Sequence, residues 1–182
     1  MKGKKIIKIA VIALVSILLI LSLGLFILIS LDKNPEPEEI IKETGFFHTE
    51  STLFLRDIVR YPLRANVTPL RIADNKIKVG VSIETDELNF GVVSENLTVR
   101  KFINLKNNDK VPVKMCIPSY GNIKPYILLS KNNFILKEGQ ALEVEIAFNA
   151  TKVGIYSGEL DVIAIKPKHP FLANFFGWVE CG

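Results

Sequence analysis

The sequence predicts an all-β domain, an antiparallel β-sandwich, attached to a single N-terminal transmembrane α-helix. Two observations lead to this prediction. Residues 9–31 form an uncharged apolar run, and residues 67–166 alternate apolar and polar residues in short segments separated by turn residues. Alternation with a period of two is typical of strands that have one face in a core and the other in water.

Length and charge limit the classes of protein to consider. The 182 residues provide for one ordinary domain with accessory segments. The net charge is +4, but four of the 23 Lys and Arg residues precede residue 9, and the other 19 balance the 19 Asp and Glu residues. A neutral domain has no general attraction for phosphate backbones, so no nucleic-acid partner is expected.

Residues 9–31 are long enough to cross a bilayer. A hydrocarbon core about 30 Å thick needs roughly 20 apolar residues in a helix. Lysines precede this run and acidic residues follow it, which by the positive-inside tendency makes residues 1–8 a cytoplasmic basic tail. We therefore expect residues 9–31 to bind the lipid bilayer of the cell membrane, with the C-terminal domain outside the cytoplasm.

Two alternatives to an uncleaved anchor remain open. A cleavable signal peptide would usually have an apolar region of about 7–15 residues followed by a small-residue cleavage site, and no such site follows Leu31. A pilin-like leader would place Lys2-Gly3 before the apolar stem, although Lys8 would then lie inside that stem. Length and charge favour the anchor.

Residues 32–66 are predicted to be a spacer that contains a short amphipathic helix. Pro35 and Pro37 should end the membrane helix, because proline lacks the backbone donor that a helix needs. Further along, three apolar residues share one face at helical spacing before Pro62: Leu55, Ile58 and Val59. The solvated face of this helix would contain Arg56, Arg60 and Arg64.

Residues 67–166 contain the predicted strands. The first two would form a hairpin with Asp74-Asn75 as its two-residue turn, since both residue types tolerate left-handed backbone angles. The later strands are DELNFGVV, NLTVRKFINLK, VPVKMCI, KPYILLS, FIL, ALEVEIAF and GIYSGELDVIAI. Many short strands with turn residues between them are typical of a β-sandwich.

Three motifs in this region match a known pattern. They are LNFGVV, with L-x-F-G at its start; INLKNNDKVPV, where Asn107 precedes a tight turn and Pro112 follows it; and LKEGQALEVEIAFNATKVGIYSGELDV, where a turn glycine precedes G-x-Y-x-G-x-L. Together they resemble ASH-type immunoglobulin-like domains, relatives of the Hydin and major-sperm-protein modules. Asp109 departs from the pattern, because a glycine is common at its position.

The resemblance covers about Asp86 to Ile165, roughly half of the chain. It implies an immunoglobulin-like sandwich that serves as a binding or spacer module, and it implies no catalytic residues. With the hairpin before Asp86, the expected total is about 7–9 strands.

Paired carboxylates are the strongest candidates for chemistry in this sequence. Glu143 and Glu145 lie two apart on a predicted strand, so both side chains point away from the apolar face of that strand. No neighbouring His, Lys or glycine-rich loop completes an acid–base site. The same reasoning predicts that Glu159 and Asp161 face water. We therefore expect no enzyme activity, no catalytic, cofactor or metal residues, and no identifiable small-molecule substrate.

Two further motifs suit a domain outside the cytoplasm. Three N-glycosylation sequons begin at Asn66, Asn96 and Asn149, and plain turn asparagines are the alternative interpretation. A disulfide between Cys116 and Cys181 would tie the tail to the sandwich if the α-carbons lie within about 7 Å. The alternative is a buried thiol at Cys116 and a free or intermolecular thiol at Cys181.

The C-terminal tail, residues 167–182, is rich in aromatic residues. Its candidate interface residues are Phe171, Phe175, Phe176 and Trp178. In a helix, Phe171, Leu172, Phe175, Phe176 and Val179 would form one apolar stripe. Three interpretations remain: a segment that caps the sandwich, a contact with the membrane interface, or a docking surface for a partner subunit.

These expectations define a functional hypothesis. The chain would be a single-pass membrane protein whose outer domain binds protein partners within a cell-envelope assembly, through edge strands and loops. An accessory subunit of an envelope enzyme, and a secreted or pilin-like subunit cleaved from its leader, are the alternatives.

Overall fold

The computed structural model describes residues 2–30, 41–69, 88–179 and 181; within these ranges the side chains of residues 2–7, 28–30 and 178 are not described. The predicted turn at Asp74-Asn75 lies outside the described residues, as do residues 32–40 of the predicted spacer. The described residues form one helix, ten strands and two short 3₁₀ segments.

Helix α1 (Lys2–Ser30) accounts for the apolar run. Residues Lys8–Ile27 have a mean hydropathy of 3.0, and no residue of this stretch is fully buried, although Leu25 near its end is partly buried. The hydroxyls of Ser16 and Ser22 donate to the carbonyls of Ile12 and Leu19 within the helix, so these polar groups are satisfied without water. Among the described residues this is the one helix long and apolar enough to cross a membrane.

Two β-sheets follow. The strands are β1 (Gly45–Glu50), β2 (Phe54–Thr68), β3 (Leu88–Ser94), β4 (Thr98–Lys106), β5 (Val113–Cys116), β6 (Ser119–Gly121), β7 (Ile127–Leu129), β8 (Phe134–Leu136), β9 (Ala141–Asn149) and β10 (Gly154–Pro167). The 3₁₀ segments are η1 (Lys124–Tyr126) and η2 (Pro170–Trp178). The predicted all-β class with one N-terminal apolar helix is confirmed.

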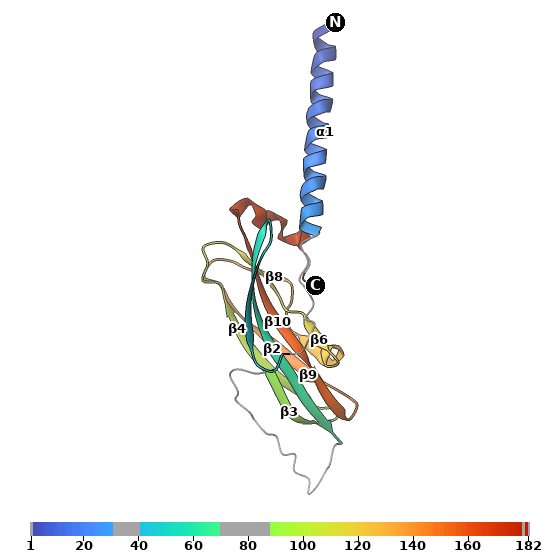
Figure 1. Cartoon of the computed structure of the whole chain (residues 1–182), viewed down its shortest axis with the longest axis vertical. Coiled ribbons are helices and arrows are strands. Elements are labelled where there is room, and N and C mark those ends of the chain that lie inside the picture. Colours follow the sequence, from blue (N-terminus) through green and yellow to red (C-terminus); the bar gives the residue numbers. More distant parts are fainter. Residues whose placement is uncertain (1, 31–40, 70–87, 180, 182) are drawn as a thin grey trace.

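The larger sheet has seven strands in the order β1-β2-β10-β5-β8, with β3 also pairing with β2 and β6 with β10. The smaller sheet has the order β4-β9-β7. All of these pairs are antiparallel except β2 with β3, which is parallel. Strands β2 and β10 pair over the whole length of β10 and run along the long axis of the β domain (Figure 1).

The predicted short helix is wrong, because residues 54–68 form strand β2. Apolar residues at helical spacing in this segment also fit a strand, and fourteen-residue pairing with β10 decides between the two. Of the three arginines predicted to face water, Arg56 is buried, Arg60 is largely buried and Arg64 alone is exposed. The larger sheet therefore begins at Gly45 and not at Val67.

Pro62 lies inside β2 although proline cannot donate to a sheet ladder. Its position explains how the strand tolerates it. On the edge of β2 away from β10, strand β1 pairs as far as Arg60 and strand β3 pairs from Leu63 onward. Pro62 therefore falls in the interval between these two neighbours.

The main hydrophobic core, called here the inner core, lies between the two sheets. Phe148 of β9 is fully buried there, and its ring stacks on Phe90 with 5.2 Å between centroids. Leu63 and Leu160, from the two long strands, complete the same layer. The apolar face predicted for β9 provides Val144 and Ile146 to this core, as alternation requires.

A second hydrophobic cluster, called here the outer core, lies on the opposite face of the larger sheet. Its buried residues are Phe54, Ile58, Cys116, Ile163, Ile165, Leu172, Phe176 and Val179. The last three come from the C-terminal tail, which covers the sheet beside the end of α1 (Figure 1). The two central strands are thus apolar on both faces at this end.

Candidate functional site

The aromatic tail is divided between buried and exposed side chains. Phe176 is buried in the outer core and its ring lies 6.1 Å from that of Phe54. Phe175 is half-buried, whereas Phe171 is 58% exposed. Trp178 belongs to η2, but its side chain is not among those described. The tail is a 3₁₀ segment, in which the predicted single stripe does not form, because three residues per turn distribute these side chains differently.

A disulfide joins Cys116 of β5 to Cys181 of the tail, with 5.3 Å between the α-carbons. This separation meets the distance condition given above. Cys116 is fully buried at the centre of the outer core. The bond therefore fixes the tail across the face of the larger sheet.

Lys114 provides a second connection to the tail. Its ammonium is buried and donates hydrogen bonds to the carbonyls of Phe176, at 2.7 Å, and Val179. Burial lowers the pKa of Lys114 below its ordinary value. These bonds give the carbonyl of Val179 a donor and add a second donor to the carbonyl of Phe176, which also accepts from the N–H of Val179, at the C-terminal end of η2.

The predicted position of Glu143 is confirmed, but the prediction for Glu159 and Asp161 is wrong. Glu143 is exposed, and Glu145 is one-third exposed and pairs with Arg100 at 3.1 Å. Glu159 and Asp161 are 0% and 1% exposed. The face of β10 that carries them is covered. The alternation of polar and apolar residues along this strand therefore does not distinguish a solvent-exposed face from a buried one.

These two carboxylates and Arg60 form a charged cluster on the outer face of the larger sheet. Arg60 lies opposite Asp161 in the β2–β10 register, and its Nε and Nη2 donate to the two carboxylate oxygens at 2.7 Å each. The same Nε lies 3.3 Å from Oε2 of Glu159. Such a two-pronged pairing is the strongest geometry between these groups.

Two more groups close this charged cluster. The backbone N–H of Ile41 donates to Oε1 of Glu159, so the chain is held against the sheet before β1 begins. The ring of Phe47 lies under the Arg60 guanidinium, 5.2 Å from its carbon. Hydrogen bonding to Asp161 raises the pKa of Arg60 above its ordinary value, against the opposite effect of burial. The arrangement pairs these buried charges with one another and ties the segment before β1 to the larger sheet.

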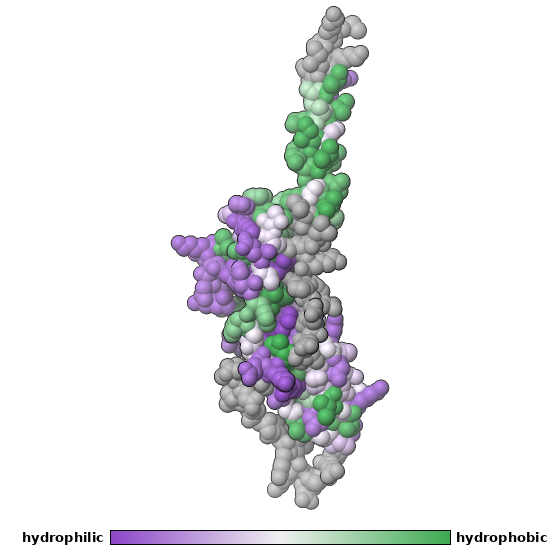
Figure 2. Space-filling model, in the orientation of Figure 1, coloured by the Kyte–Doolittle hydropathy of each residue, from purple (hydrophilic) through white to green (hydrophobic). Residues whose placement is uncertain are grey.

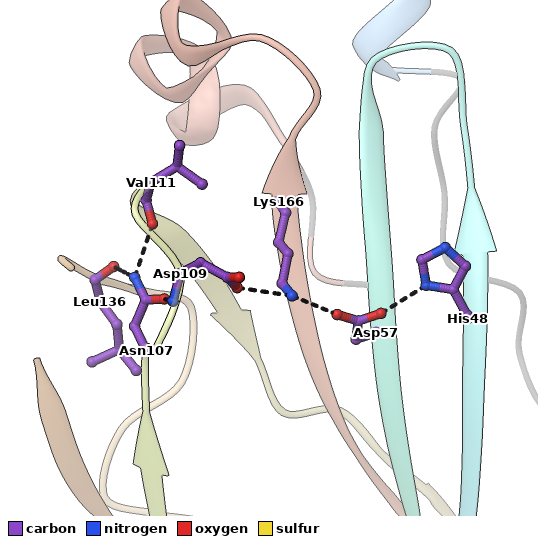
Figure 3. Close-up of polar contacts among 7 residues, drawn as sticks. All are labelled: His48, Asp57, Asn107, Asp109, Val111, Leu136 and Lys166. Atoms are coloured by element: carbon purple, nitrogen blue, oxygen red, sulfur yellow. Dashed lines mark hydrogen bonds and ion pairs between the residues drawn. The ribbon is translucent and has the colours of Figure 1, made fainter. Parts of the chain in front are cut away.

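A second chain of polar contacts lies across β1, β2 and β10 (Figure 3). Asp57 shares a 2.7 Å hydrogen bond with Nδ1 of His48 and accepts a 2.7 Å contact from Nζ of Lys166. Lys166 also contacts Asp109 at 2.8 Å. We call this set the polar chain.

Asn107 links the polar chain to the turn after β4. Its buried amide donates to the carbonyls of Val111 and Leu136, and its Oδ1 accepts from the N–H of Asp109 (Figure 3). The sequence predicted that Asn107 precedes a tight turn. Its hydrogen bonds show its role in that turn, which is to hold the turn against β8.

The charges of the polar chain are mutually stabilised. Burial acts to raise the pKa of Asp57, but hydrogen bonds from Lys166 and His48 outweigh it and the pKa lies below its ordinary value. Burial acts to lower the pKa of Lys166, and its bonds to Asp109 and Asp57 raise the pKa above the ordinary value. The groups are at least one-quarter exposed, so the polar chain is a surface network.

The three sequon asparagines lie at the end of the domain away from α1. Asn66 is exposed within β2, two residues before it ends. Asn96 is exposed in the turn before β4 with φ of 63°, a left-handed conformation that asparagine tolerates. Asn149 ends β9, is half-buried, and donates to the hydroxyl of Thr98.

A shallow pocket of about 450 Å³ lies beside Asn66. Asn89, Ile155 and Arg64 are among its lining residues. In the register, Val92 of β3 and Ile155 of β10 lie on either side of Asn66, and these two side chains are 73% and 77% exposed. The pocket and this apolar row form one distal patch.

Within the part of the chain that the structure describes, no group of three or more His, Cys, Asp or Glu residues is placed to hold a metal ion. Comparisons with protein-family models, with curated proteins and with solved structures found no match.

Proposed function

We propose that this chain is a single-pass membrane protein with a cytoplasmic N-terminus, whose extracytoplasmic immunoglobulin-like sandwich is a binding or structural module of a cell-envelope assembly. The observation that supports it most is the joining of an apolar, unburied helix to a β domain that contains a disulfide. Disulfides persist mainly in oxidising compartments outside the cytoplasm.

The arrangement of the surface also favours binding over catalysis. The buried acidic residues are already paired with Arg60, and the polar chain is satisfied within itself. The distal patch, in contrast, leaves Val92 and Ile155 exposed at the end away from α1. Exposed apolar groups beside polar ones are characteristic of contact surfaces.

Protease protection tests the topology. In intact cells stripped of any outer layer, added protease should digest the β domain and leave the anchor, and mass spectrometry should find the lysine-rich start still attached. Protection of the domain from outside would contradict the proposed orientation. Loss of residues 1–8 together with the apolar run would show a cleaved leader.

Crosslinking tests the proposed role. A photoreactive residue at Val92 or at Ile155 should capture a stoichiometric partner in native membranes, whereas the same residue at exposed Asn104 of β4 is the matched control. Capture at the distal patch alone is the expected result. Recovery of the chain by itself from both distal positions would contradict the assembly proposal.

A further inference from the structure

The tail segment η2 presents apolar surface on two sides. Leu172, Phe176 and Val179 are buried against the larger sheet. The Phe171 ring points elsewhere, is 58% exposed and stacks only loosely on His169, with 6.0 Å between centroids. Figure 2 shows apolar surface continuing from α1 onto the adjoining end of the β domain.

Direct contacts place η2 beside one end of helix α1. Helix α1 touches η2, and Leu25 of the helix packs against the outer core. Leu25 lies five residues before Ser30, where α1 ends, and the sequence is uncharged and largely apolar throughout this interval. At a rise of about 1.5 Å per residue, this contact is about 7.5 Å from the end of a helix whose apolar length matches a bilayer core, a depth close to the boundary between headgroups and acyl chains.

The backbone of η2 is suited to such a place. The N–H of Leu172 donates to the carbonyl of His169, and that of Val179 donates to the carbonyl of Phe176. The Lys114 ammonium supplies further donors to the last carbonyls of the segment. Backbone groups that are satisfied inside the protein can leave water at low cost.

We propose that η2 is an interfacial element that rests on the same bilayer that α1 crosses, with the Phe171 ring inserted at the boundary between headgroups and acyl chains. Aromatic rings concentrate at this depth. The inference rests on the proposed function, because it requires α1 to be in the membrane. The outer core would then face the lipid. The domain would contact the membrane through α1 and η2, two elements that are far apart in the sequence.

Depth-dependent fluorescence quenching tests this placement. In full-length protein with Trp178, the single tryptophan of the chain, changed to Phe, a reporter is introduced as Phe171→Trp or, for the matched control, as Ile155→Trp at the distal patch. Both positions are exposed, so neither reporter disturbs a core. Each protein is reconstituted in phosphatidylcholine vesicles with and without bromine on the upper part of the acyl chains.

The reporter at residue 171 should lose most of its fluorescence in brominated lipid and emit at a shorter wavelength than the control, which should change in neither respect. Emission at 171 that matches the control would overturn the proposal. A short emission wavelength at 171 without quenching would also overturn it, since a protein partner or a second copy would then cover the ring.

Extraction of the same vesicles at alkaline pH separates the two proposals. If the protein stays with the vesicles but residue 171 is not quenched, the anchor stands and the interfacial placement of η2 is wrong. If the protein is released, the membrane anchoring itself is wrong.

Discussion

The two faces of the larger sheet are closed in different ways. The inner core is covered by a second sheet, so apolar strands meet apolar strands over a broad area. The outer core is covered at one end by a short tail, and its closure depends on a disulfide and on the buried Lys114. Beyond this tail the same face holds the charged cluster of Arg60, Glu159 and Asp161.

This difference indicates that the inner face supports the fold of the domain, whereas the outer face determines how the domain is attached. Removing inner-core contacts should unfold the whole β domain. Removing outer-core contacts should release the tail while the two sheets persist.

The largest loss is expected for Phe148→Ala in the inner core. Phe148 is 0% exposed and contacts the rings of Phe90, Tyr126 and Tyr156. Truncation of a buried Phe costs about 3–5 kcal/mol of unfolding free energy. Urea denaturation of the full-length protein in detergent, followed by circular dichroism, would measure it. Phe102→Ala, at a 54% exposed ring of β4, is the control and should change stability little.

Arg60→Met should lower the free energy of unfolding by about 3 kcal/mol, because two buried carboxylates would remain without their cation. The control is Arg64→Met on the same strand, where the side chain is exposed. Adding Asp161→Asn to Arg60→Met should restore part of the loss, and a purely additive result in the double variant would contradict the charge argument.

Lys114→Met should cost about 1–3 kcal/mol, since the carbonyls of Phe176 and Val179 would each lose the ammonium as a donor and only Phe176 would keep the backbone N–H of Val179. The effect should be local. We expect proteolysis within residues 167–179 to accelerate while the urea midpoint of the sheets moves little. Lys106→Met, an exposed lysine, serves as the control. Global unfolding at the same urea concentration as tail release would contradict a separable outer core.

The smallest effect concerns the polar chain at acid pH. The pKa of Asp57 is lowered in the folded protein, so its contribution is present above the unfolded value of about 3.9 and is lost as pH falls through the folded pKa. The side chain is 43% exposed, which limits the contribution to about 0.2–1 kcal/mol.

Stability curves against pH would measure this contribution. Asp57→Asn should be less stable than the parent near neutral pH and equal to it at the lowest pH. Glu143→Gln, at an exposed carboxylate, should follow the parent throughout. A constant difference between parent and Asp57→Asn at every pH would mean that packing, and not charge, accounts for the loss.

The local pattern of apolar and polar residues was sufficient to predict helix α1 and most strands from β3 onward. Strand β9 shows why: its apolar residues alternate regularly and only one of its faces meets the core. Strand β2 was predicted as a helix because Leu55, Ile58 and Val59 fit helical spacing and Pro62 resembled a helix stop; in the strand, Ile58 and Val59 lie on opposite faces, and both faces are covered. Its identity depends on pairing with β10, about 100 residues later, which no local window contains.

The charged cluster was missed for a related reason. Glu159 and Asp161 alternate with apolar residues as exposed side chains do, and only Arg60, 101 residues from Asp161, reveals that their face is covered. The signal that could have suggested this is the apolar residue pair Ile163 and Ile165 on that same face of β10. The pairing of Cys116 with Cys181 depends equally on three-dimensional proximity, since their spacing of 65 residues specifies no partner.

The paired strands β2 and β10 have a mechanical consequence. Their shared length is 14 residues, which at about 3.3 Å per residue is a rigid ribbon about 46 Å long, parallel to the long axis of the domain. A pull on the distal patch along that axis would load the cross-strand hydrogen bonds in shear, all together, and not one after another. Under the proposed topology, the domain would hold the distal patch at a fixed distance from the membrane and would transmit tension to α1 with little extension.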